Sequence, residues 1–141
     1  MNKYCLGLLF NCDETGVLLL SKRSTDTYNP GLWNGVGGKV EKGEDGVCAM
    51  VRETEEETGL LVPENEWRLL GVISDYDIFH VDVFAARADI SSARQTTDEI
   101  IKIFDRETAK DLDFAASVKD VLLTWLEGGS LLPESPSPPR P

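Results

Sequence analysis

The chain has 141 residues, 41% of them hydrophobic, and a formal net charge of −11. This length and composition predict a single globular domain with a core of ordinary size. The strong negative charge argues against nonspecific binding to nucleic acid or to an anionic membrane, because like charges repel.

The cysteines and the apolar segments indicate a cytoplasmic protein. Cys5, Cys12 and Cys48 show neither metal-binding nor redox spacing, which predicts reduced thiols. The apolar stretch within the first ten residues is shorter than a signal sequence and lacks a small-residue cleavage site. No segment reaches transmembrane length, so we expect no membrane association.

The apolar patterning predicts a mixture of strands and helices along residues 1–132. The predicted strands cover residues 3–11, 17–22, 67–74, 78–86 and 99–104, and residues 33–40 are expected to be partly extended. A first helix is predicted at 45–58. Asp113 is expected to cap a second helix, which carries apolar residues at Val118, Val121, Leu122 and Trp125 and ends at Gly128-Gly129.

These elements predict an α/β or α+β layered domain with a mixed sheet. The segment 133–141 contains five prolines in nine residues. This composition predicts a disordered tail beside the single folded domain.

Three carboxylates of the first predicted helix share one face. Glu53, Glu56 and Glu57 stand at i, i+3 and i+4, which places the latter two about 60° and 40° to either side of the first. Like charges at this spacing destabilise a bare helix, and a bound cation is the simplest compensation. Oxygen ligands suit Mg²⁺, Mn²⁺ or Ca²⁺ better than zinc.

The alternative interpretation is a solvated acidic face, which is the commoner meaning of a glutamate cluster. Two features count against it. The opposite side of the helix carries an apolar stripe suited to a core, and glycines stand where the segment opens and closes. The stripe consists of Val47, Met50, Val51, Thr54 and Thr58.

The segment from Gly38 to Leu60 resembles the Nudix box, G-x5-E-x7-R-E-U-x-E-E-x-G-U, in which U is a bulky aliphatic residue. Every fixed position is matched, and the one departure is Thr54 at the first U position. The resemblance extends more weakly from Tyr4 to Leu126. It implies an α/β/α sandwich around a mixed sheet, with the box forming a loop, a helix and a loop at one edge.

The resemblance also implies an activity. It implies Mg²⁺-dependent hydrolysis, with Mn²⁺ as a substitute, of a nucleoside diphosphate linked to a further group. For a nucleoside triphosphate the products are the monophosphate and pyrophosphate. Glu53, Glu56 and Glu57 match the metal ligands, the backbone carbonyl of Gly37 completes the shell, and Arg52 holds the glutamates in place.

Fewer signals lie outside the box. Glu44 is a box residue that we interpret as structural, because negative charge is favoured at a helix start. By resemblance, Glu99 supplies a further metal ligand or base in preference to Asp98, and the alternative is an exposed acidic pair. Arg23 and Lys39 can reach phosphates, or they are ordinary solvated cations.

The stretch from Trp33 to Lys39 resembles the W-N-G-x-G-G-K segment of Nudix enzymes that act on oxidised purine triphosphates. It implies that Asn34 reads the base, as an amide can; the alternative is a structural turn. Those enzymes also read the base from a C-terminal segment with paired carboxyls. Here that region is Phe114-Ala115-Ala116-Ser117, in which Phe114 can stack on a base but the carboxyls are absent. The absence of these carboxyls argues against specificity for 8-oxoguanine.

The leading hypothesis is a hydrolase of ordinary or oxidised nucleoside triphosphates that takes a small-molecule nucleotide and no nucleic acid. Other substrates remain open: ADP-ribose, a nucleotide sugar, a dinucleotide polyphosphate or an RNA 5′ end. A non-catalytic Nudix-like binding domain is the third alternative. Such domains usually lose box carboxylates, and all of them are present here.

Overall fold

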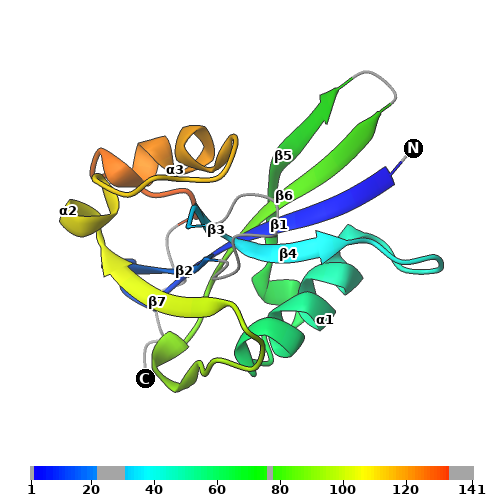
Figure 1. Ribbon diagram of the computed structural model, residues 1–141, viewed down its shortest axis with the longest axis horizontal. Coiled ribbons are helices and arrows are strands. Elements are labelled where there is room, and N and C mark those ends of the chain that lie inside the picture. Colours follow the sequence, from blue (N-terminus) through cyan, green and yellow to red (C-terminus); the bar gives the residue numbers. More distant parts are fainter. Residues whose placement is uncertain (1, 22–30, 76–77, 134–141) are drawn as a thin grey trace, which may run out of the picture.

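The computed structural model describes residues 2–21, 31–75 and 78–133. In these residues one mixed sheet has the strand order β3-β2-β1-β6-β5, with β4 paired to β1 and β7 paired to β2 (Figure 1). The strands are β1 (Asn2–Phe10), β2 (Gly16–Ser21), β3 (Trp33–Asn34), β4 (Val36–Lys39), β5 (Arg68–Asp75), β6 (Phe79–Arg87) and β7 (Ile100–Asp105). The helices are α1 (Gly46–Thr58), α2 (Arg106–Ala109) and α3 (Val118–Leu126), with short 3-10 turns at Glu64–Glu66 and Ile90–Ser92.

Strand β1 is the centre of the sheet. It runs parallel to β6 over its full length, from Asn2 opposite Phe79 to Phe10 opposite Arg87. Its other edge pairs antiparallel with β4 at the first half and with β2 at the end. This arrangement brings β4, the strand that leads into the Nudix-like segment, into the middle of the molecule.

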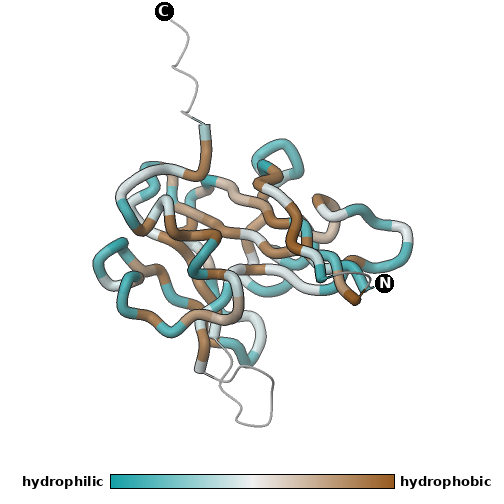
Figure 2. The backbone as a smooth tube through the Cα atoms, turned by 90° about the horizontal axis from the view of Figure 1, so that it is seen from above, coloured by the Kyte–Doolittle hydropathy of each residue, from teal (hydrophilic) through white to brown (hydrophobic). Residues whose placement is uncertain are grey.

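The two faces of the sheet carry separate core clusters. Cys5 and Leu9 of β1 belong to the cluster that packs against α1, whereas Leu6, Leu8 and Phe10 belong to the cluster that packs against α3. Alternate residues of a strand point to opposite faces, so the two helices cover opposite sides of the sheet. The expected three-layer fold is confirmed, and Figure 2 shows apolar residues along the inner strands and polar residues at the outer loops.

Helix α1 begins and ends as its sequence predicts. The Asp45 carboxylate accepts a hydrogen bond from the Cys48 amide at 2.9 Å, and Gly59 ends the helix with a φ of 76°. Thr54, the departure from the Nudix box, is fully buried. Its hydroxyl donates to the carbonyl of Met50 at 2.7 Å, so the polar group is satisfied within the helix.

The predicted start of the last helix is wrong. The Asp113 carbonyl accepts a hydrogen bond from the Trp33 amide at 2.9 Å, and the Ala115 amide donates to the Trp33 carbonyl at 2.8 Å. The segment around Phe114 therefore lies against β3 in extended form, and α3 begins only at Val118. Helix α2, capped by Asp105, was not predicted.

No helix in the described ranges is long and apolar enough to cross a bilayer. The proline-rich segment lies outside the described residues beyond Pro133, so its disorder stays a prediction.

Candidate functional site

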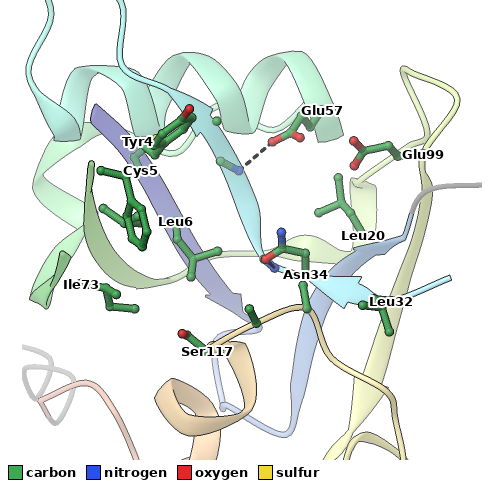
Figure 3. A pocket seen from close by; sticks show the side chains of 17 residues that line it. Tyr4, Cys5, Leu6, Leu20, Leu32, Asn34, Glu57, Ile73, Glu99 and Ser117 are labelled. Atoms are coloured by element: carbon green, nitrogen blue, oxygen red, sulfur yellow. Dashed lines mark hydrogen bonds between the residues drawn. The ribbon is translucent and has the colours of Figure 1, made fainter. Parts of the chain in front are cut away.

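A cavity of about 540 Å³ lies on the sheet beside the carboxylate helix (Figure 3). Its floor consists of residues from β1, β5 and β6 on the sheet face that α3 covers. The residues of this floor are Tyr4, Leu6, Ile73, Phe79 and Val81. The remaining wall comes from β2, β4, α1 and the segments that flank β3, β7 and α3.

Glu57 and Glu99 both line this cavity. The Gly37 amide donates a hydrogen bond to Oε1 of Glu57 at 2.8 Å. Figure 3 shows the Glu99 side chain, from the segment before β7, extending toward Glu57 of α1, whose carboxylate is turned to the Gly37 amide. The fold thus brings together two carboxylates that are 42 positions apart in the sequence.

Burial raises the pKa values of two glutamates of the box, Glu57 and Glu53. Burial raises the pKa of Glu57 to about 8; the hydrogen bond from Gly37 opposes the rise, and the negative charge of Glu99 adds to it. Burial also raises the pKa of Glu53, while the hydrogen bond from Arg52 opposes that rise. A buried acid with a raised pKa is one whose charged form needs a partner, and a cation is such a partner.

Arg52 ties the acidic residues to the loop before the helix. Its Nη2 donates to Glu44 Oε1 at 2.6 Å and to the Lys39 carbonyl at 3.0 Å. Its Nη1 contacts Glu53 at 2.8 Å and Glu56 at 3.3 Å. These contacts raise the pKa of Arg52, with the Glu44 hydrogen bond as the largest cause.

Glu44 serves chiefly as the anchor of Arg52. It accepts from both Nε and Nη2 of the guanidinium and from the Glu41 amide at 2.9 Å. The Arg52 hydrogen bond lowers the pKa of this carboxyl. The structural role predicted for Glu44 therefore acts through Arg52, and the helix cap itself is Asp45.

Two glycines, Gly37 and the first box residue Gly38, allow the helix to approach β4. A Cβ on Gly37, whose φ is 149°, would lie 2.1 Å from the Cys5 carbonyl oxygen. A Cβ on Gly38 would lie 2.7 Å from Oε1 of Glu53. Side chains at these positions would disturb the β1–β4 pairing or displace the Glu53 carboxylate.

Asn34 also lines the cavity. Its Oδ1 accepts a hydrogen bond from the Gly35 amide at 2.8 Å, which orients the side chain and leaves its NH₂ group as a donor for a ligand. Figure 3 shows Asn34 in the view between Leu20 and Ser117. From this position the Asn34 amide can donate a hydrogen bond to the edge of a ring that lies on the apolar floor.

Five other predicted site residues in the described part of the chain do not line this cavity: Lys39, Arg52, Glu53, Glu56 and Phe114. Phe114 packs, partly buried, against the α3 core cluster. Lys39 is exposed at the end of β4, and its carbonyl, not its ammonium group, contacts Arg52. Arg23 lies outside the described residues.

Sequence reasoning missed most of the apolar floor and Ser117. The alternation of Phe79 and Val81 on β6 was visible, but their neighbours Tyr4 and Leu6 come from a distant strand. Ser117 has a φ of 69°, in the left-handed region, and makes no side-chain cap to α3 although serine is a favoured capping residue. No sequence signal marks that conformation.

The donor atoms around the helix suit a hard divalent cation, because all are oxygens. In the part of the chain that the structure describes, no three His, Cys, Asp or Glu side chains are close enough together to hold a metal as they stand. Arg52 bridges Glu53 and Glu56 instead. The oxygen donors and the raised pKa of Glu57 therefore fit a divalent cation. Binding of that cation requires the carboxylates to move closer together.

Known structures share this fold. A MutT structure from a study of Aliivibrio salmonicida and Vibrio cholerae has a TM-score of 0.77 and 23% identity, over 89% of this chain and 97% of that one. A MutT Nudix hydrolase from Burkholderia pseudomallei has a TM-score of 0.69 and 22% identity, over 84% and 93% of the two chains.

Sequence comparisons agree. The m7GpppN-mRNA hydrolase NUDT17 of Xenopus laevis is 43% identical over 56 residues, or 39% of this chain, and the match spans only 19% of that protein. The family model for the NUDIX domain matches residues 4–126, almost the whole described chain. With the layered fold and the carboxylate helix in place, this match shows that the chain belongs to the Nudix hydrolase family.

Proposed function

We propose that this protein hydrolyses nucleoside triphosphates, ordinary or oxidised, to a monophosphate and pyrophosphate by water attack on phosphorus. The observation that carries the proposal is a shared cavity: Glu57 and Glu99 line it together with Asn34. Carboxylates that can hold a cation and an amide that can read a ring are thus within reach of one small ligand.

The carboxylates form the reactive end of the proposed site. Nudix hydrolases generally use divalent metal ions, and we propose Mg²⁺, with Mn²⁺ as a substitute. Glu53, Glu56, Glu57, Glu99 and the Gly37 carbonyl would hold the ion. When bound, it would screen the polyphosphate charge, polarise a phosphoryl oxygen and acidify the attacking water.

Arg52 keeps the glutamates in place through its contacts with Glu44, Glu53 and Glu56. This support matters because small displacements of groups around a reacting phosphoryl are costly in rate. Lys39 and Arg23 remain proposed phosphate contacts, and Phe114 a proposed contact of the base, on the family resemblance alone.

The recognition end is apolar. A volume of about 540 Å³ is within the range of small-molecule sites, and a floor of aliphatic and aromatic side chains suits one face of a base. Asn34 would donate to the edge of that ring. No acidic pair stands at 114–117, so we propose only a modest preference for an oxidised guanine.

A second candidate substrate is a capped RNA 5′ end. The 43% identity to an m7GpppN-mRNA hydrolase favours it, although that match spans 56 residues. The net charge of −11 counts against it, because an RNA chain would meet an acidic surface. A nucleoside triphosphate is also anionic, but it has no RNA chain to lie against the acidic surface, and the proposed cation would screen its phosphates.

A substrate panel tests the proposal. We expect the highest kcat/KM among 8-oxo-dGTP, dGTP, dATP and dCTP to exceed that for ADP-ribose, a nucleotide sugar, a dinucleotide polyphosphate or m7G-capped RNA. Cleavage of a non-triphosphate at higher efficiency would assign another Nudix substrate. Absence of turnover on the whole panel, with metal bound, would indicate a binding domain.

We predict that Asn34→Ala lowers kcat/KM for the preferred purine triphosphate by about 10-fold or more, with a much smaller loss on dCTP. The reason is that the purine edge loses the hydrogen-bond partner that the Asn34 amide would provide. Steady-state kinetics on the four triphosphates measure this difference. Equal losses on all of them would mean that Asn34 supports its loop and does not read the base.

A further inference from the structure

The segment that carries Glu99 is attached to the last turn of α1. After Ala93, which packs against the α1 core cluster, the chain has no regular structure until β7 begins at Ile100. Two helix carbonyls bind it. The Arg94 amide donates to the Thr58 carbonyl at 3.0 Å, and the Thr96 hydroxyl donates to the Glu56 carbonyl.

These carbonyls belong to the end of the helix, where backbone acceptors lack partners within the helix. The Arg94 guanidinium also lies against Gly59, where a Cβ would come within 2.9 Å of its Cζ. The absence of a side chain at Gly59 therefore lets the segment pack closely on the helix end. We name residues 94–99, attached in this way, the clasp.

The Thr96 hydroxyl binds α1 between two of the proposed metal ligands. The Glu56 carbonyl belongs to the peptide unit that joins Glu56 to Glu57, two of the proposed metal ligands. Three residues further along the clasp, Glu99 turns into the cavity, and its amide donates to the Thr97 hydroxyl at 3.2 Å. A single short segment thus links the backbone of Glu57 to the position of Glu99.

The bonds between the clasp and α1 oppose the repulsion between the Glu57 and Glu99 carboxylates. The Glu57 and Glu99 carboxylates lie near one another in the lining of the cavity (Figure 3), and like charges repel. The clasp is exposed from Arg94 to Asp98, so little apolar packing holds it. Without specific bonds to the helix, repulsion would move Glu99 away from the cavity before a cation arrived.

We infer that Thr96 is a positioning residue, which holds Glu99 in register with Glu57 so that both meet the same divalent cation. The inference rests on the proposed function, because it assumes that these carboxylates bind the metal. Thr96 touches neither substrate nor metal. It acts through the backbone of α1 and through Glu99.

The test is the affinity of the purified protein for Mn²⁺, measured by electron paramagnetic resonance, together with kcat and KM. Thr96→Val keeps the shape and removes the hydroxyl. We expect its Kd for Mn²⁺ to rise about 10-fold, in line with the loss of groups that orient metal ligands, and kcat to fall while KM for the nucleotide changes little. Thr96→Ser should restore both values.

Two controls separate positioning from general loss of stability. Thr108→Val makes the same change on α2, where the exposed hydroxyl lies beside Asp105 and outside the cavity, and should leave Mn²⁺ binding unchanged. In a Glu99→Gln background, Thr96→Val should have almost no further effect, because the carboxylate that it positions is gone.

The outcomes distinguish the two claims. If the unaltered protein binds Mn²⁺ and Thr96→Val binds it equally well, the inference is overturned and the proposed function stands. The inference is also overturned if Thr96→Val weakens binding to the same extent with and without Glu99. If the unaltered protein neither binds Mn²⁺ nor turns over, the proposed function fails, and the inference fails with it.

Discussion

Three box carboxylates have different environments although they are close together. Glu57 is half-buried with one amide donor, and its pKa rises to about 8. Glu53 is also half-buried and has the Arg52 guanidinium at 2.8 Å, and burial raises its pKa while the hydrogen bond from Arg52 opposes the rise. Glu44 accepts from the same guanidinium at 2.6 Å, and its pKa is lowered. Arg52 makes its shortest contact with Glu44, and its ion pairs do not include Glu57. Glu57 is therefore the carboxylate whose charged form gains most from a bound cation.

This environment predicts a pH-dependent stability of the metal-free protein. The pKa of Glu57 is 4.5 in the reference state and about 8 in the folded state, so the folded state holds the proton more tightly. Its contribution to stability is complete below about pH 4.5 and is lost as the pH rises through 8. We expect the free energy of unfolding in EDTA, measured by urea titration, to decline over this range. The decline should be smaller in Glu57→Gln, and an identical pH slope in both proteins would contradict the assignment.

The sequence could predict part of this site. Glu57, Glu99 and Asn34 line one cavity because the motif fixes the helix face and the loops that surround it. The rest depends on contacts between distant segments. Tyr4 reaches the cavity through β1–β6 pairing, and Phe114 is drawn into the core by its pairing with Trp33. Neither contact leaves a pattern in the local sequence.

Among the elements, α1 was predicted most closely, because its signals are local. Asp45 and Gly59 stand at its ends, and the threonines of its buried face satisfy their hydroxyls within the helix. The start of α3 was missed by four residues because backbone bonds to β3 override the capping preference of Asp113. Local signals therefore fixed α1, and nonlocal pairing fixed the beginning of α3.

The close approach of β4 and α1 gives a prediction for Gly38. In Gly38→Ala the new methyl would lie 2.7 Å from Oε1 of Glu53, so the flexible carboxylate must move. We expect kcat to fall by about 10-fold or more while the melting temperature changes little. Kinetics and thermal melts of the same preparation measure the two effects.

Gly46→Ala is the matched control for this substitution. Its methyl would lie 2.3 Å from Oδ2 of Asp82, a carboxylate on β6 that does not line the cavity. Both variants thus displace an acidic side chain, but only Gly38→Ala displaces a proposed ligand. Similar kcat values for the two variants would show that Glu53 has no demanding role in turnover.

At the scale of the whole molecule, the charge of −11 is the dominant electrostatic property. Metal that binds the native carboxylates and not the unfolded chain stabilises the fold. We predict that millimolar Mg²⁺ raises the melting temperature of the native protein and that the rise shrinks in Glu56→Gln. Differential scanning calorimetry at constant ionic strength measures both. An equal rise in the two proteins would mean general screening of the negative charge.

The most direct test of the central claim measures pyrophosphate release from the preferred triphosphate with Mg²⁺, and again with excess EDTA, for three proteins. We predict that EDTA abolishes turnover in the unaltered protein and that Mg²⁺ restores it. Glu57→Gln should lower kcat by about 10²-fold or more even at saturating Mg²⁺. Glu55→Gln, on the same helix but exposed and outside the cavity, should retain activity. Full turnover in EDTA, or near-normal kcat in Glu57→Gln, would contradict the assignment of the site.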